Sequence, residues 1–153
     1  MGIASVIQNS AKADLLRAGT NFNTSGGTPA GHAFKLALYT DSTTIDTTTT
    51  AYGGPSNEVS GTGYSSGGNA LTNTGVGTTT VTSFTDFSDT SWTSASFTAR
   101  GCLIYNTTAI TGLTANRAVC SITFGGDKTV SSGTFTIQFP TNDSSSAIIR
   151  LTS

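Results

Sequence analysis

Apolar and polar residues alternate one by one through the C-terminal half of the chain. From residue 134 to 139 every second residue is Phe or Ile and the residues between are Thr or Gln, and residues 117–124 show the same alternation. Successive side chains of a β-strand point to opposite faces, so a period of two is what a half-buried strand requires. The stretch from Trp92 to Leu151 therefore predicts a set of β-hairpins that close a core. Its strand segments are 95–100, 102–105, 117–124, 133–139 and 147–151.

The composition limits both the core and the classes of partner. Apolar residues make up 35% of the 153-residue chain, against ~45–50% in an average protein, so we expect one thin-cored domain such as a two-layer sandwich. Charged residues make up 10%, and the net charge is −1. The seven Lys and Arg are scattered, so no basic stripe is available to bind nucleic acid. A surface made polar by Thr, Ser and Gly suits extracellular, virion or assembly proteins that pack against copies of themselves.

The sequence predicts neither a membrane span nor a secretory leader. No stretch approaches the ~18 consecutive apolar residues that a membrane helix needs. The first ten residues lack a basic region, and Ser5, Gln8 and Asn9 interrupt their apolar residues. We therefore expect a protein that is made and assembled in a cytoplasm, with no membrane partner.

Residues 3–18 are the one helix candidate. Apolar residues recur there every four positions: Ile3, Ile7, Ala11 and Leu15. This stripe predicts an amphipathic helix that ends at Gly19. The helix either caps an open end of the sandwich or is an arm that docks on a neighbouring subunit. A Gly-rich linker over residues 20–32 follows, so we expect an N-terminal arm and linker over 1–32 and a β-domain over 33–153.

The candidates for chemistry have simpler structural explanations. His32 is the only histidine, and no Cys, Asp or Glu lies near it at ligand spacing. Asp41 and Asp46 do not follow the oxygen pattern of a calcium loop, so we expect them to cap turns. Residues 57–68 are rich in glycine but contain no Lys and open no helix, so neither nucleotide-binding fingerprint is met. No nucleophile lies beside a base, so we expect no catalytic residue, no metal ligand and no cofactor.

The two cysteines lie on consecutive predicted strands whose connecting loop is centred near residue 111. An antiparallel register about that centre gives the pairs Cys102–Cys120, Leu103–Val119 and Tyr105–Arg117. Because assembly in a cytoplasm keeps thiols reduced, we predict two buried free thiols rather than a disulfide.

Three further residues or segments near these strands have predicted structural roles. Gly125–Lys128 is expected to be a turn, with Gly supplying a positive φ. Arg100 is expected to pair with Asp89 or Asp127. The single Trp92 is expected to fill the core.

Six motifs follow one another along the chain. They are NEVSGTGY (57–64), DTSW (89–92), TARGCLIYN (98–106), NRAV (116–119), FGGDKT (124–129) and GTFTIQF (133–139). Taken together in this order, they resemble a family of small structural proteins of tailed bacteriophages and prophages, over residues 33–151. The resemblance implies a virion component without catalysis, and in particular a capsid decoration (cement) protein.

We therefore expect an all-β protein, an antiparallel β-sandwich or barrel-like domain with a short N-terminal helix or arm. It would form a homo-oligomer, expected to be a trimer, that binds the major capsid protein in the virion and stabilises the head. The expected attachment residues are Ile3, Val6, Ile7, Leu15 and Leu16. One alternative is a tail or head–tail connector component. Another is a carbohydrate- or receptor-binding module that stacks its ligand on Trp92, Tyr52 and Tyr64.

Overall fold

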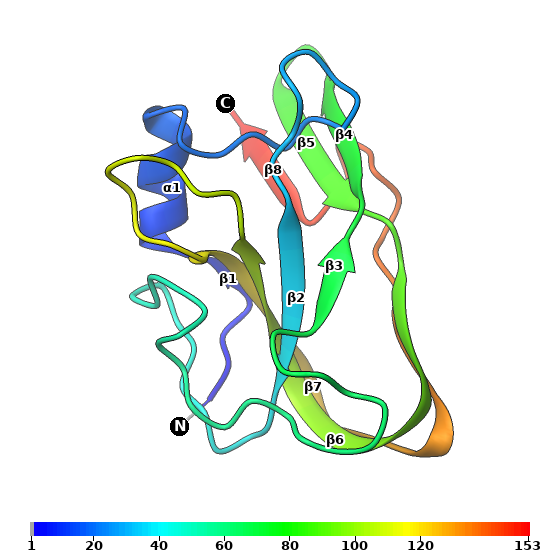
Figure 1. Cartoon of the computed structure of the whole chain (residues 1–153). Coiled ribbons are helices and arrows are strands. Elements are labelled where there is room, and N and C mark those ends of the chain that lie inside the picture. The colour runs from blue at the N-terminus through cyan, green and yellow to red at the C-terminus, as the bar shows by residue number, and fades with distance from the viewer. Residues whose placement is uncertain (1) are drawn as a thin grey trace.

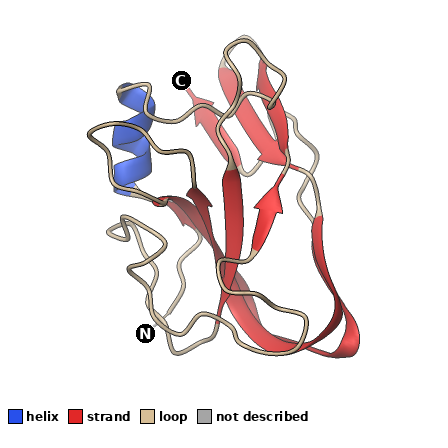
Figure 2. Ribbon diagram, in the orientation of Figure 1, coloured by secondary structure: helices blue, strands red, loops and turns tan. Residues whose placement is uncertain are grey.

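The chain folds into two antiparallel β-sheets and one short helix, in a computed structural model that describes residues 2–153 (Figures 1 and 2). The elements are β1 (Val6–Ile7), α1 (Asn9–Leu16), β2 (Phe34–Tyr39), β3 (Asn69–Leu71), β4 (Asn73–Thr78), β5 (Thr82–Phe87), β6 (Thr90–Asn106), β7 (Arg117–Ile137) and β8 (Ile149–Thr152). The larger sheet has the strand order β1–β7–β6–β2–β3, and the smaller has the order β4–β5–β8. The predicted fold class, an all-β sandwich with a short N-terminal helix, is confirmed. No helix within residues 2–153 has the length and apolarity that a bilayer crossing requires.

One long hairpin, β6–β7, dominates the larger sheet. Its two strands stay paired from Thr90–Ile137 to Asn106–Arg117, so the segments predicted as separate strands merge into two long ones. In Figure 1 both strands curve together around the lower right of the molecule.

The predicted turn over Gly125–Lys128 is wrong, because this segment lies inside β7. Gly101 pairs with Thr123 and Ala99 with Lys128, so Arg100 alone faces the four residues 124–127. Gly125 does have a positive φ, of 72°. That conformation produces a bulge that bends the strand rather than reversing it, because β7 keeps its pairing with β6 on both sides of the bulge.

The cysteine register also differs from the prediction. The observed pairs are Cys102–Ile122, Leu103–Ser121, Ile104–Cys120, Tyr105–Ala118 and Asn106–Arg117, so the three predicted pairs are wrong. The register is already shifted by one residue at the loop end, where Asn106 and not Tyr105 pairs with Arg117, and an irregularity between Ile104 and Tyr105 shifts it by one residue more. Both thiols are nevertheless free and buried, as predicted.

The main core lies between the two sheets and is rich in aromatic side chains. Trp92 is buried and packs edge-on against Phe97 and Phe135, so the prediction that it fills the core is confirmed. At the other end of this core Phe22 stacks on Phe34, with ring centroids 4.9 Å apart. A second cluster, on the opposite face of the larger sheet, includes Tyr39, Ile45 and Leu103.

The helix is shorter than predicted, because residues 3–7 are extended. Ile3 forms a parallel bridge with Ile45, and Val6 and Ile7 pair with the edge of β7. A short isolated helix is marginal in water, whereas the unpaired edge of β7 offers hydrogen bonds to the backbone of Val6 and Ile7. The tertiary pairing therefore overrides the helical spacing of the first apolar residues.

Residues 20–32 contain no helix or strand, as their Gly and Pro content predicts. They nevertheless fold onto the sandwich. Phe22 is buried in the main core, and the Gly31 N–H and His32 N–H donate to the carbonyls of Thr24 and Asn21. This segment therefore holds a defined path between α1 and β2.

Candidate functional site

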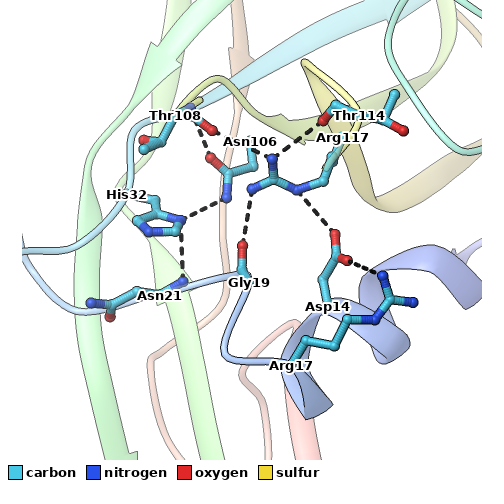
Figure 3. Close-up of polar contacts among 9 residues, drawn as sticks. All are labelled: Asp14, Arg17, Gly19, Asn21, His32, Asn106, Thr108, Thr114 and Arg117. Carbon is cyan, nitrogen blue, oxygen red and sulfur yellow. Dashed lines mark hydrogen bonds and ion pairs between the residues drawn. The ribbon is translucent and has the colours of Figure 1, made fainter. Parts of the chain in front are cut away.

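A buried ion pair joins α1 to the long hairpin. Arg117 Nε lies 3.0 Å from Asp14 Oδ2, and the side chains are only 4% and 5% exposed (Figure 3). The same guanidinium donates hydrogen bonds to the carbonyls of Gly19, at 2.9 Å, and Thr114, at 3.3 Å. Arg17 Nη1 lies 3.8 Å from Asp14 Oδ1 on the exposed side. Arg117 thus connects the helix, the segment after it and the β6–β7 loop.

His32 belongs to the same polar region. The backbone N–H of Asn21 donates to His32 Nδ1 at 3.4 Å, and the Asn106 side-chain amide lies 2.9 Å from the same atom (Figure 3). A ring nitrogen that accepts an N–H carries no proton of its own, so the imidazole is neutral with its hydrogen on Nε2. Burial, and then the positive charge of Arg117, lower the pKa of His32. His32 therefore acts as a neutral acceptor that positions the loop.

The contacts in Figure 3 join α1 and the segment that follows it to the β6–β7 loop. Arg117 Nη1 and Nη2 donate to backbone carbonyls, and Nε lies 3.0 Å from the Asp14 carboxylate. Within residues 2–153 no group of three or more His, Cys, Asp or Glu side chains converges as a metal site. Sequence reasoning missed the Asp14–Arg117 pair, since nothing in either local sequence indicates a partner so far along the chain.

A second polar cluster surrounds Glu58. Its carboxylate accepts four hydrogen bonds: from Tyr52 Oη and Ser66 Oγ on Oε2, and from Tyr64 Oη and the Gly67 N–H on Oε1. Burial by itself raises the pKa of Glu58, but these hydrogen bonds outweigh it and hold the pKa below its ordinary value. The cluster fixes the Gly-rich loop over 57–68 onto β2, where Tyr64 Oη also accepts the Leu38 N–H. The tight turns predicted for this loop are present at residue 63 and at residues 66–67.

The aromatic residues of the carbohydrate-binding alternative are engaged within the protein. Trp92 is buried, so its ring offers no face to a ligand. Tyr64 lies against Trp92, and Tyr52 stacks on Tyr105 with centroids 4.5 Å apart. The hydroxyls of both tyrosines donate to Glu58. This geometry does not favour a sugar platform at these positions.

Two of the predicted capping and pairing roles are also visible. Asp46 Oδ1 accepts the Thr48 N–H and hydroxyl, so it caps a turn as expected. Arg100 Nη1 lies 3.2 Å from Asp127 Oδ1, so the predicted pairing of Arg100 with one of two acids is confirmed for Asp127. This pair is exposed, and it joins Arg100 of β6 to Asp127 in the β7 bulge.

Two apolar grooves open on the surface. The larger, of about 560 Å³, runs along β7 and the segment after it, and its lining includes Ile122, Phe124, Ile137, Phe139 and Ile148. The smaller, of about 380 Å³, lies between α1, the segment that follows it and strands β4, β5 and β8, and its lining includes Leu15, Phe22, Val76, Phe84 and Leu151.

Residues 2–153 expose four large apolar side chains, two of which line the smaller groove. They are Leu16 (91% exposed), Val76 (56%), Val81 (58%) and Leu151 (55%). Val76 and Leu151 line the groove, Leu16 follows the lining residue Leu15, and the Val81 carbonyl accepts the Ser153 N–H beside the end of β8. In Figure 1 α1, the β4–β5 turn and the end of β8 all lie at the top of the molecule. We call the surface formed by Leu15, Leu16, Val76, Val81 and Leu151 the end face.

The structure divides the five predicted attachment residues into two groups. Leu15 and Leu16 belong to the end face. Ile3 is buried in the second core cluster, and Val6 and Ile7 are half-buried at the β7 edge. The sequence stripe therefore does not form one surface, because its first half is extended and its second half is helical. Val76, Val81 and Leu151 were missed, since a single apolar residue among polar neighbours does not reveal whether its side chain is buried.

No family model, no curated protein and no solved structure matches the chain.

Proposed function

We propose that the protein is a structural component of a tailed-phage virion, a capsid decoration protein that attaches through its end face. The observation that carries the proposal is an apolar groove at one end of the sandwich, which the exposed Val76 and Leu151 line and whose neighbouring segments carry the exposed Leu16 and Val81. Contiguous exposed apolar surface is uncommon on soluble monomers and marks sites of association. The order of sequence motifs described above supports the choice of a phage virion.

The chemistry of the surface supports protein docking rather than catalysis. None of the residues that line the groove of the end face is charged, so a partner that covers the groove desolvates no charge there. The polar clusters around Arg117 and Glu58 are occupied by internal hydrogen bonds and ion pairs. Association of this kind adds apolar burial at each contact, at about 25 cal/mol per Å² of area removed from water.

The end face is held rigidly, which favours a preformed contact over a mobile arm. Leu15 and Leu16 lie on the last turn of α1, and Asp14 of the same turn is bound to Arg117. On the other side of the groove, Val76 and Leu151 lie on strands that pair with β5. A rigid site loses less conformational entropy on binding than a flexible one.

The first test is the copy number of the protein in purified particles of the phage or prophage that encodes it. Quantitative mass spectrometry should give a copy number comparable with that of the major capsid protein. A copy number many-fold lower would favour a tail or head–tail connector component. Absence from the particles would contradict both assignments.

The second test examines the end face itself. We expect Leu16→Ser and Leu151→Ser, separately and together, to weaken binding of the purified protein to particles that lack it, measured by co-sedimentation. Both side chains are exposed, so the melting temperature should stay within a few degrees of the wild type. Ala70→Ser, at an exposed position of β3 outside the end face, is the control and should bind normally. Normal binding by the double variant would contradict the end face as the attachment site.

A further inference from the structure

The two sheets do not close on each other along one side of the molecule. β7 pairs with β6 along its length, but on its other edge β1 covers only Cys120 and Ser121. β8 pairs with β5 and is the last strand of its sheet. The larger apolar groove lies between β7, the segment after it and Ile148, the residue before β8. We call this opening the seam. It is distinct from the end face and does not depend on the proposed function.

The seam combines an unpaired strand edge with an apolar floor. From Lys128 to Ile137, after the bulge, β7 has a strand partner on one side only. The floor comes from residues that alternate toward the core, among them Ile122, Phe124 and Phe139. A free edge offers backbone donors and acceptors in the spacing of a strand, and a floor of alternate side chains accepts every second residue of that strand.

We propose that the seam binds an extended segment of a partner protein, with apolar side chains on alternate residues and a carboxylate that meets Lys128. The segment adds a strand to the Lys128–Ile137 edge of β7 and covers the groove. Backbone hydrogen bonds supply affinity, and the groove together with Lys128 supplies selectivity.

The protein's own β1 shows that this side of β7 accepts a strand. Val6 and Ile7 pair antiparallel with Ser121 and Cys120. They line a smaller hollow of about 270 Å³ that includes Ile122 and Ile148, both of which also line the larger groove. The seat of β1 is therefore continuous with the seam, and an added segment occupies the part of the edge that β1 leaves uncovered.

Lys128 selects the charge of the occupant. It is the only charged residue in the lining of the groove, and it takes part in none of the three ion pairs found in residues 2–153. An occupant that covers an unpaired cation without supplying a carboxylate leaves that charge desolvated. A second copy seated groove to groove supplies none, because the lining contains no Asp or Glu. Charge therefore favours an acidic segment of another protein over a second copy.

The test uses capped ten-residue peptides that alternate Thr and Val, with one Val replaced in turn by Glu or by Lys. Binding to the full-length protein is measured by fluorescence anisotropy. We expect the best Glu peptide to bind about three- to tenfold more tightly than the matching Lys peptide. Lys128→Glu should reverse that order, and Lys12→Glu, on the exposed side of α1, should leave it unchanged. Two further Glu peptides carry N-methyl groups on every second backbone amide, one on the odd residues and the other on the even residues. Only one of the two should lose binding, because a strand directs every second amide toward a given neighbour.

Three results would overturn the proposal. One is the absence of saturable binding by any peptide to protein that melts normally. Another is a charge preference that Lys128→Glu leaves unchanged. The third is concentration-dependent dimerisation that Phe139→Ser abolishes, which would assign the seam to a second copy instead.

Discussion

Arg117 Nε and Asp14 Oδ2 lie 3.0 Å apart, with both side chains almost completely buried. The contact joins the first helix to the first residue of β7. The N-terminal segment is therefore held to the sandwich by a buried charge pair as well as by the pairing of β1 with β7. This anchoring fixes Leu15 and Leu16 in the end face, on which the proposed attachment depends.

Removing one member of the Asp14–Arg117 pair should lower the free energy of unfolding. Asp14→Ala leaves the Arg117 charge buried without its carboxylate, so we expect a loss of about 3–5 kcal/mol in the free energy of unfolding. The measurement is urea denaturation of single and double variants. In the double variant with Arg117→Met the loss should be smaller than the sum of the two single losses. Additive losses would mean that the two groups do not interact.

The stability of the protein should fall as the pH decreases through the range in which histidine titrates. The folded-state pKa of His32 lies below its ordinary value of 6.5, so the unfolded chain binds the proton more readily than the native protein. Stability is complete above about pH 6.5 and declines as pH falls toward the folded-state pKa. Denaturation at several pH values between about 5.5 and 7.5 measures this slope. His32 is the only histidine, so His32→Gln should flatten it.

Glu58 should contribute stability at neutral pH that is lost in acid. Its pKa is lowered from 4.5, so the contribution is present above that value and disappears as pH falls through the lower folded-state pKa. Glu58→Gln replaces a charged acceptor of four hydrogen bonds, and we expect a loss of roughly 1.5–3 kcal/mol at pH 7. Asp41→Asn, which changes an exposed carboxylate, serves as the control. A loss for Glu58→Gln no larger than that of the control would contradict this role.

Gly68 should tolerate no side chain. Its φ is 66°, and an added Cβ would collide with the Leu36 carbonyl on β2. Gly68→Ala should therefore lower the free energy of unfolding by at least about 2 kcal/mol, from strain and overpacking together. At Gly53 a Cβ meets nothing within 4 Å, so Gly53→Ala should change stability little. Thermal denaturation of the two variants makes the comparison.

Both cysteines should resist modification in the native protein. Burial raises the pKa of both thiols, that of Cys120 to about 12, so little thiolate is present at neutral pH. A thiol reagent should label neither residue in the folded state and both in denaturant, as counted by mass spectrometry. Finding no reactive thiol after denaturation would instead indicate a disulfide.

Sequence reasoning was most successful where structure depends on neighbouring residues. The alternation in 133–139 identified a half-buried strand, and the Gly and Pro residues of 20–32 identified irregular backbone. Sequence reasoning failed where the backbone of a segment forms hydrogen bonds with a distant strand instead of following its local preference. Residues 3–7 carry helical spacing but pair with β7 and Ile45, and Gly125–Lys128 has turn composition but stays within β7.

The sequence by itself determined that this protein is an antiparallel β-sandwich with a charge-poor surface, a buried Trp92 and two buried thiols. Alternation and composition determine which side chains face the core and how charged the surface is, and they do so for any order in which the strands pair. Only the tertiary structure decided the hairpin register, the Asp14–Arg117 and Glu58 contacts, and which apolar side chains stay exposed. Those features depend on which segments meet in space, and a bulge of a few residues shifts every pair beyond it.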